Sequence, residues 1–179
     1  NPYLMSIAKE IEKTIRELGF HMILLSHSDE EGMEYAALQI ILEQRVAAIV
    51  VIPTGGNSDV FLSIKKSKIP IISIDREIED VETDLIVDDN YYGSFESIKY
   101  LSTLGHQRIG IIYGHTRNSI GRDRYQGAVD AIKHFNLEED PMLFKETNFK
   151  EEFAYRATME LMRLPEAPTA IYSCNNTMT

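Results

Sequence analysis

The chain has 179 residues and a formal net charge of −10, because 28 Asp and Glu side chains outnumber 18 Lys and Arg side chains. Phosphate chains are bound by clustered positive charge, so this balance argues against nucleic-acid binding by this segment. No apolar run approaches the roughly 20 residues that a membrane-spanning helix needs, so no membrane partner is expected. The one cysteine, Cys174, cannot form an internal disulfide, which favours a reducing, cytoplasmic location.

The first half of the sequence alternates helix-like and strand-like segments. Apolar residues at helical spacing between Leu4 and Leu18 predict a helix that Gly19 ends. A similar stripe between Met33 and Ile41 predicts a second helix. Further elements follow from short apolar runs bounded by turn residues: strands at 21–25, 47–52 and 71–74, and a helix at about 59–66. Short connections in this order predict a parallel sheet with helices on both faces.

The second half repeats this design after an acidic, loop-like stretch at residues 77–84. The expected strands are 85–87, 108–113, 142–148 and 169–173, and the expected helices are one ended by Gly105, one from about 119, and one at 150–164. We therefore predict an α/β fold with two doubly wound parallel-sheet lobes, residues 1–84 and residues 85–179. The first lobe lacks an opening strand and the second lacks closing elements. We expect the chain to be a fragment, incomplete at both ends.

Ligands of doubly wound sheets bind beyond the carboxyl ends of the strands. Those ends carry hydroxyl, amide, carboxylate and guanidinium groups and one aromatic ring: Ser26 to Asp29, Pro53 to Gly55, Asp75-Arg76, Gly114 to Asn118, Asn148-Phe149 and Asn175-Asn176. Such a set suits hydrogen bonding to a polyol with a ring on its apolar face. It contains no activated nucleophile, and the five histidines lack metal-ligand spacing. We expect neither an enzyme nor a bound metal or cofactor.

An ordered set of motifs across the chain resembles the effector-binding domain of LacI/GalR-type transcriptional regulators, which has a periplasmic-binding-protein-like fold. The motifs are Asn1-Pro2-Tyr3, Ser73 to Arg76, Val87 to Gly93, Leu104 to Ile109, Arg124 to Gly127, Pro168 to Ile171 and Asn175 to Met178. Each motif alone is weak, and the order of the whole set makes it specific. The Leu-Gly-His run at 104–106 is the most regulator-like piece. Periplasmic sugar-binding proteins share the Asn-Pro-aromatic, Asp-Arg and Arg-x-x-Gly pieces.

By that resemblance, seven residues face a ligand between the lobes: Asn1, Tyr3, Asp75, Arg76, Arg124, Phe149 and Asn175. Arg124 matches the family's cleft arginine, Phe149 its stacking aromatic ring, and Asn175 the amide after a late strand. The family usually has Asn-Asp at the last site, whereas this chain has Asn175-Asn176, which puts a charge role at position 176 in doubt.

Each of these positions also has a purely structural interpretation. Asp75-Arg76 could be a solvated turn, and Arg124 could make a surface ion pair worth about 0–1 kcal/mol. Phe149 could belong to the core, and Tyr3 could be a partly buried aromatic at a helix start. The Asp88-Asp89-Asn90 stretch is more typical of a helix cap and lobe hinge than of a ligand site. Structural roles are also expected for two further residues: Cys174 is expected to pack in the core, and His106 is expected to make a structural hydrogen bond.

The resemblance implies a regulator's sensor domain. A small effector, a sugar or sugar derivative, would bind between the lobes and change the affinity of a DNA-binding headpiece for operator DNA. That headpiece would precede Asn1, and the domain would form a homodimer. The alternative is a sugar-binding protein of a transport system, monomeric and exported. An enzyme on the same scaffold is the least favoured class, because no catalytic constellation is visible.

Overall fold

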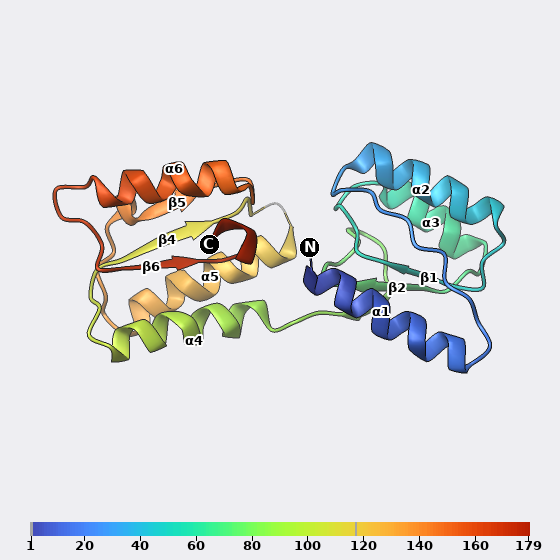
Figure 1. Ribbon diagram of the computed structural model, residues 1–179, viewed down its shortest axis with the longest axis horizontal. Coiled ribbons are helices and arrows are strands. Elements are labelled where there is room, and N and C mark those ends of the chain that lie inside the picture. Colours follow the sequence, from blue (N-terminus) through green and yellow to red (C-terminus); the bar gives the residue numbers. More distant parts are fainter. Residues whose placement is uncertain (1, 117) are drawn as a thin grey trace. The chain divides into compact units, whose positions relative to one another are not determined.

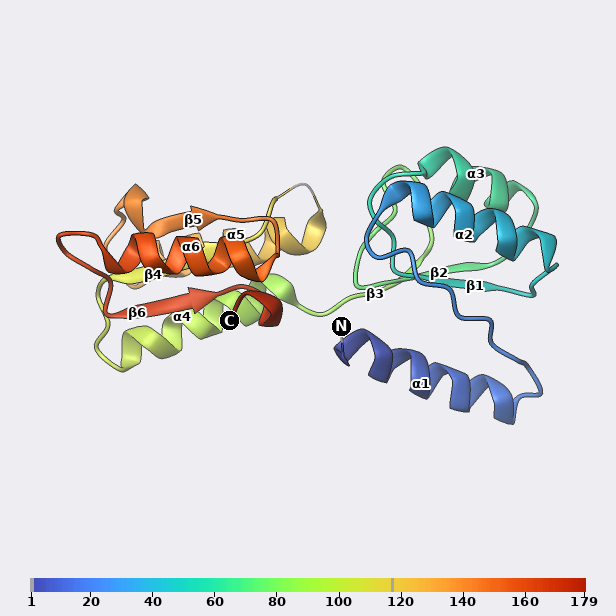
Figure 2. The same cartoon turned by 45° about the horizontal axis from the view of Figure 1, so that its top comes forward.

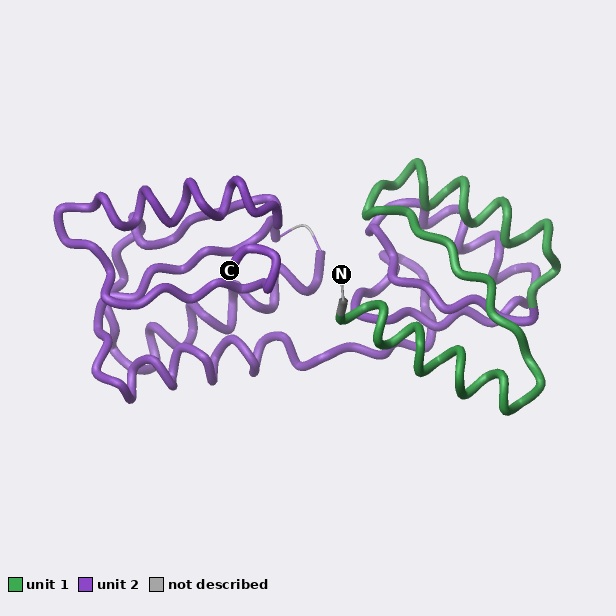
Figure 3. Tube along the Cα trace, in the orientation of Figure 1, with its two compact units in different colours: residues 1–46 green, residues 47–179 purple. Residues whose placement is uncertain are grey.

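The computed structural model describes residues 2–116 and 118–179, and the chain divides into two compact units, Asn1–Val46 and Ala47–Thr179 (Figure 3). The first unit contains α1 (Pro2–Glu17) and α2 (Glu31–Glu43), the two helices predicted from the apolar stripes. Gly19 follows α1 with a φ of +83°, a left-handed conformation that suits glycine. The predicted end of the first helix is therefore confirmed.

The strand predicted at residues 21–25 is wrong, because this segment has no regular secondary structure. Two of its side chains, Ile23 and Leu24, are 50% and 56% exposed. Among the described residues, the two sheets are made of other segments, and none of their strands pairs with this one. A strand keeps its geometry by exchanging backbone hydrogen bonds with a neighbour, and an apolar sequence cannot supply that neighbour.

The second unit begins with a three-stranded parallel sheet in the order β1-β2-β3. Its strands are β1 (Ile49–Val51), β2 (Ile71–Ile74) and β3 (Asp84–Ile86), and α3 (Ser58–Lys66) lies between β1 and β2 in the sequence. The buried apolar side chains of these elements are Ile49, Phe61, Ile64, Ile71 and Ile74. Strand β3 runs from Asp84 to Ile86 and pairs with β2, so it contains residues on both sides of the predicted lobe boundary at 84/85. The division of the chain into these two lobes stays a prediction.

A second parallel sheet follows in the order β5-β4-β6, with β4 in the centre. The strands are β4 (Ile109–Tyr113), β5 (Phe144–Glu146) and β6 (Ala170–Ser173). The helices around it are α4 (Asn90–Thr103), α5 (Ser119–His134) and α6 (Glu151–Met162), with 3-10 turns η1 (Pro141–Leu143) and η2 (Asn176–Met178). These helices and strands match the predicted ones within a few residues. The α/β class with parallel sheets is therefore confirmed.

The second sheet has a hydrophobic core on each face. Figures 1 and 2 show α4 and α5 on one face of the sheet and α6 on the other. Ile109 and Ile111 of β4 pack with α4 and α5, whereas Ile112 packs with α6. Successive strand residues point to opposite faces, so the unbroken apolar run of β4 suits a strand covered on both sides. None of the helices in the described residues is long and apolar enough to cross a membrane.

Arg108, just before β4, joins the loops that follow α5 and α6. Its Nη2 donates to Asp140 Oδ2 at 2.7 Å, its Nη1 pairs with Glu138, and its Nε donates to the Glu166 carbonyl at 2.6 Å. The Arg108 side chain is largely covered. Planar guanidinium groups suit several simultaneous acceptors, so this single side chain ties two loops to the start of the central strand.

Asp140 gives this cluster a dependence on pH. A hydrogen bond from the Met142 backbone N–H and another from Arg108 hold the pKa of Asp140 below its usual range. The carboxylate's contribution to stability is therefore full above its ordinary pKa and is lost as the pH falls through the lowered folded-state value. We expect Asp140→Asn to flatten the acid side of the stability curve, measured by urea unfolding from about pH 5 to about pH 2. Asp123→Asn, at an exposed position of α5, is the control. Parallel curves for Asp140→Asn and the unmodified protein would contradict the assignment.

Candidate functional site

Asp75 and Arg76 form the turn directly after β2, at the carboxyl edge of the first sheet. Asp75 has a φ of +71°, a conformation that is strained for a residue with a side chain. Its N–H donates to the Ile86 carbonyl at 2.8 Å, and Arg76 Nη1 donates to the Pro53 carbonyl at 3.3 Å. The Asp75 and Arg76 side chains are only 14% and 17% exposed, so the turn is not a solvated loop. Strained, half-enclosed polar residues of this kind gather at ligand sites.

Arg124 lies in the second turn of α5 and is held by two hydrogen bonds. Its Nε donates to Oδ1 of Asn90 at 2.7 Å, and its Nη1 donates to the carbonyl of Cys174 at 2.7 Å. Within the described residues these partners are an amide and a backbone carbonyl, which does not match a surface ion pair. A guanidinium has five N–H donors, so three remain for other acceptors.

The contact between Arg124 and Asn90 depends on a glycine one turn further along α5. A Cβ at Gly127 would lie 2.2 Å from the carbonyl oxygen of Tyr91, in the first turn of α4. Real Cβ atoms do not approach an oxygen this closely, so only glycine lets α5 rest against this backbone. The Arg-x-x-Gly spacing therefore has a physical reason: glycine sets the helix separation at which arginine reaches the start of α4.

Phe149 follows β5 and has a φ of +62°, a second strained backbone at a predicted site residue. Its ring lies directly over Gly114, because a Cβ there would be 2.0 Å from the ring carbon Cζ. The edge of the His115 ring lies beside it, with centroids 5.0 Å apart and ring planes at 87°. The ring also packs against the core under α6, so Phe149 is partly a core residue at the carboxyl edge of the sheet.

The strain at Phe149 can be measured by comparing two substitutions. Both Phe149→Gly and Phe149→Ala remove the ring, but only glycine adopts a positive φ without cost. We expect Phe149→Gly to be the more stable variant by about 1 kcal/mol in urea unfolding. At Phe153, within α6, the order should reverse, with alanine the more stable by about 1 kcal/mol. Alanine more stable than glycine at both positions would show that residue 149 is unstrained in solution.

The other predicted site residues are placed differently. Asn175 caps η2, because its Oδ1 accepts a hydrogen bond from the Thr177 N–H at 2.8 Å. Tyr3 lies in the first turn of α1, in the other compact unit, and is about half exposed. Asn1 lies outside the described residues. Ligand contacts by these residues stay predictions.

The structure brings several candidates to one edge of the second sheet. Phe149 follows β5 and Asn175 follows β6, while Arg124 reaches the carbonyl of Cys174, which precedes Asn175. Asp75 and Arg76 lie at the corresponding edge of the first sheet. In doubly wound folds these carboxyl edges are where ligands bind. The arrangement can offer hydrogen bonds from a guanidinium and an amide, beside an aromatic ring, to a small polar molecule.

Asn90 also contacts Arg124, although its sequence context predicts a helix cap formed by Asp88, Asp89 and Asn90. The cap is confirmed, since Asp89 Oδ1 accepts a hydrogen bond from the Tyr92 N–H at 2.9 Å. One carboxylate suffices for that cap, so the Asn90 side chain is available for Arg124. The only hint in the sequence is the run of three cap-type residues where a helix needs one.

Two structural interpretations made from the sequence are also confirmed. Burial raises the pKa of the Cys174 thiol to about 12, so the thiol stays protonated and belongs to the packing. Its partly buried neighbour Tyr172 also has a pKa raised to about 12, and the largest cause is the loss of solvent around its hydroxyl. His106 Nδ1 lies 2.9 Å from Thr169 Oγ1, which is a hydrogen bond between the end of α4 and the start of β6.

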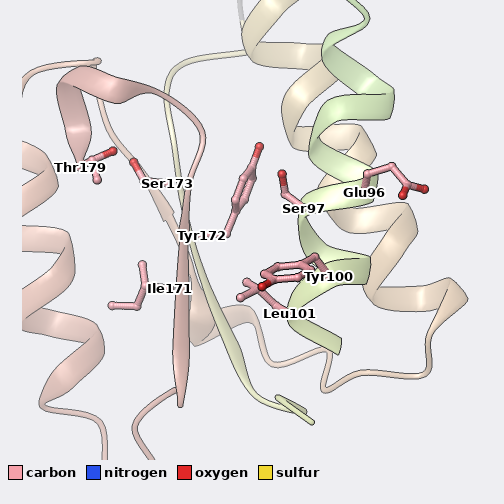
Figure 4. A pocket seen from close by; sticks show the side chains of 8 residues that line it. All are labelled: Glu96, Ser97, Tyr100, Leu101, Ile171, Tyr172, Ser173 and Thr179. Atoms are coloured by element: carbon pink, nitrogen blue, oxygen red, sulfur yellow. The ribbon is translucent and has the colours of Figure 1, made fainter. Parts of the chain in front are cut away.

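A shallow pocket of about 510 Å³ lies away from these residues, between α4 and β6 (Figure 4). It is lined by Glu96, Ser97, Tyr100, Leu101, Ile171, Tyr172, Ser173 and Thr179, none of which is a predicted site residue. Ile171 and Tyr172 point to opposite faces of the sheet, so a pocket lined by both follows the outer edge of β6. Glu96 pairs with Lys99 at 2.8 Å, and the Tyr172 hydroxyl meets Ser94 at 2.6 Å. These polar groups are already partnered, and we assign no effector site here.

Comparison with known proteins identifies the family of the chain. The model of the family described as periplasmic binding proteins and sugar binding domain of LacI family matches residues 1–179. The chain belongs to this family. Among curated relatives, the HTH-type transcriptional repressor PurR of Actinobacillus pleuropneumoniae is 25% identical over 177 residues, and that of Haemophilus influenzae strain PittEE is 28% identical over 178. Both alignments cover 99% of this chain and 53% of the relative, so the chain spans about half the length of these repressors.

Solved structures of LacI-family regulators share the fold. The Cra transcriptional dual regulator from Pseudomonas putida, in complex with fructose 1-phosphate, superposes with a TM-score of 0.87 at 21% identity, covering 99% of this chain and 66% of that chain. Transcription regulator CcpA of Lactococcus lactis gives a TM-score of 0.87 at 21% identity, with 99% and 65% covered. At these identities the likeness shows the fold alone, and it confirms the periplasmic-binding-protein-like architecture predicted from the motifs.

Proposed function

We propose that this chain is the effector-binding domain of a LacI-family transcriptional regulator. The observation that carries the proposal is Arg124: two hydrogen bonds hold its guanidinium at the carboxyl edge of a parallel sheet, with three N–H donors left over. A side chain fixed before a ligand arrives loses less entropy on binding. The family model and the repressors among the relatives supply the biological setting.

The effector is a small polar molecule, a sugar or sugar derivative. Arg124, Asp75 and Arg76 suit hydroxyl or phosphate oxygens, and the Phe149 ring suits the apolar face of a sugar. Fructose 1-phosphate is bound in the Cra structure, which supports this class of ligand. Binding of the effector shifts the protein between two conformations that differ in effector affinity, with a coupling of about 1–3 kcal/mol.

The location, oligomeric state and DNA contact of the regulator are proposed from its family. The protein acts in the cytoplasm as a homodimer, and a DNA-binding segment outside these residues contacts the operator. The acidic net charge of −10 supports the assignment of DNA contact to another segment. The alternative, a sugar-binding protein of a transport system, shares the family model but is not supported by the repressors among the relatives.

Ligand-dependent stabilisation tests the proposal directly. Thermal unfolding is measured with D-ribose, fructose 1-phosphate and, as a control, glycine, each from about 0.01 to about 10 mM. A ligand that binds only the folded protein stabilises it by RT ln(1 + [L]/Kd), so the shift must grow with concentration. We expect at least one of the two sugars to raise the unfolding temperature and glycine to leave it unchanged. No shift with either sugar at about 10 mM would contradict a sugar effector.

A further inference from the structure

Asn90 uses both ends of its side-chain amide inside the protein. Its Oδ1 accepts the hydrogen bond from Arg124 Nε at 2.7 Å, and its Nδ2 donates to the Asp88 carbonyl at 3.1 Å. The residue is only 8% exposed. The second bond fixes which end of the amide is the acceptor, so the oxygen always faces the guanidinium.

This side chain has no task in capping α4. Asp89 accepts the hydrogen bond from the Tyr92 N–H, and Asn90 is the first helical residue. Asparagine is a poor helix former, because its amide competes for backbone groups. Its presence, buried at the start of α4, therefore calls for a reason other than helix formation, and its contact with Arg124 supplies one.

The two acceptors of Arg124 fix the plane of its guanidinium. Asn90 Oδ1 approaches from the start of α4, and the Cys174 carbonyl approaches from the end of β6. An arginine side chain has several rotatable bonds, and two contacts on different nitrogens remove most of this rotamer freedom before a ligand binds. The carbonyl belongs to the backbone, so Asn90 is the member of this clamp that side-chain substitution can remove.

We propose that Asn90 is a positioning residue of the effector site. It orients Arg124 for the ligand and links it to the Asp88 carbonyl, in the segment that leads from β3 to α4. A ligand that displaces the Arg124 guanidinium therefore also displaces, through Asn90, the segment that joins the two sheets of this unit. The inference rests on the proposed function, because it assigns Arg124 to the effector.

The orientation of Arg124 can be measured without any ligand. In ¹⁵N NMR spectra, the Arg124 Nε–H signal, assigned by its loss in Arg124→Lys, reports hydrogen-bond protection through its exchange rate with water. We expect Asn90→Ala to speed this exchange by about tenfold or more, because the acceptor is gone. Asn90→Asp keeps an oxygen facing Arg124 and should retain the protection, although it loses the donor to Asp88.

Asp89→Ala is the matched control, one residue away. It removes the α4 cap, with an expected loss of stability, but leaves the contact between Asn90 and Arg124 in place. Exchange at Arg124 that is equally slow in Asn90→Ala and the unmodified protein overturns the proposal. Exchange that is equally fast in Asn90→Ala and Asp89→Ala also overturns it, since that pattern means general loosening of the helix start.

Binding gives the second measurement, with fructose 1-phosphate as the probe in calorimetry. We expect Asn90→Ala to bind it about tenfold more weakly and Asp89→Ala to bind it as the unmodified protein does. Equal affinity in Asn90→Ala and the unmodified protein overturns the positioning role. Failure of the proposed function looks different: neither fructose 1-phosphate nor D-ribose then shifts the Arg124 Nε–H signal of the unmodified protein, whatever Asn90→Ala does.

Discussion

Replacing Gly127 by alanine is expected to lower the stability of the second unit by about 2 kcal/mol, although alanine is the better helix former. The new methyl group would sit 2.2 Å from the Tyr91 carbonyl oxygen, and this obstacle is backbone that cannot rotate away. Overpacking of this kind costs about 1–3 kcal/mol or more, while the gain in helix propensity is at most about 1 kcal/mol. Urea unfolding of Gly127→Ala measures the balance.

Gly93 provides the control for this experiment. It also lies within a helix, α4, but a Cβ built there has no heavy atom within 4 Å. Gly93→Ala should therefore leave stability unchanged or raise it by up to about 1 kcal/mol. The two substitutions are chemically identical, so opposite signs identify the helix contact as the cause. If Gly127→Ala is as stable as Gly93→Ala, the two helices do not approach as closely as described.

Replacing Arg124 by alanine is expected to weaken effector binding by about 2–5 kcal/mol, a loss seen when one partner of a desolvated charged contact is removed. The effect combines the lost donors with the Asn90 oxygen and the Cys174 carbonyl, which lose their partner. Isothermal titration with fructose 1-phosphate measures it. Unchanged affinity would remove Arg124 from the binding site.

Arg122 is the matched control, two residues before Arg124 on the same helix. It pairs with Glu77 at 3.2 Å, and both side chains are more than half exposed. Exposed pairs of this kind contribute little, so Arg122→Ala should change affinity by less than about 0.5 kcal/mol. An equal loss in both variants would point to the overall positive charge of this helix and not to a specific contact of Arg124.

The elements of the second unit could be predicted well because each carries a local signal. The apolar run Ile109–Tyr113, the glycine stop at Gly105 and the turn at Asp75-Arg76 determine strand and helix limits through interactions within a few residues. The segment 21–25 shows the limit of prediction from local signals, because it is apolar but forms no strand. A strand forms only when a neighbouring strand accepts and donates its backbone hydrogen bonds, and the apolar sequence of a segment does not show whether that neighbour is present.

The candidate site could be predicted from the sequence only as residues next to strand ends and one arginine taken from a family motif. The motif names Arg124, but it does not show that Arg124 contacts residues 34 and 50 positions away in the sequence. No periodicity or spacing encodes such contacts. The same holds for Asn175, where the sequence shows an amide after a strand, while the structure shows the same amide capping a 3-10 turn.

The strand order β5-β4-β6 has a consequence for synthesis of the chain. Both partners of β4 lie later in the sequence, so the strand leaves the ribosome with two open edges, and the second edge closes only when residues 170–173 have been made. Until then the run Ile109-Gly110-Ile111-Ile112-Tyr113 is an apolar, uncharged template for wrong pairing. The helices that flank it in sequence, α4 and α5, can cover one face early. The nascent chain therefore keeps an unpaired edge of β4 open to aggregation until β6 has been translated.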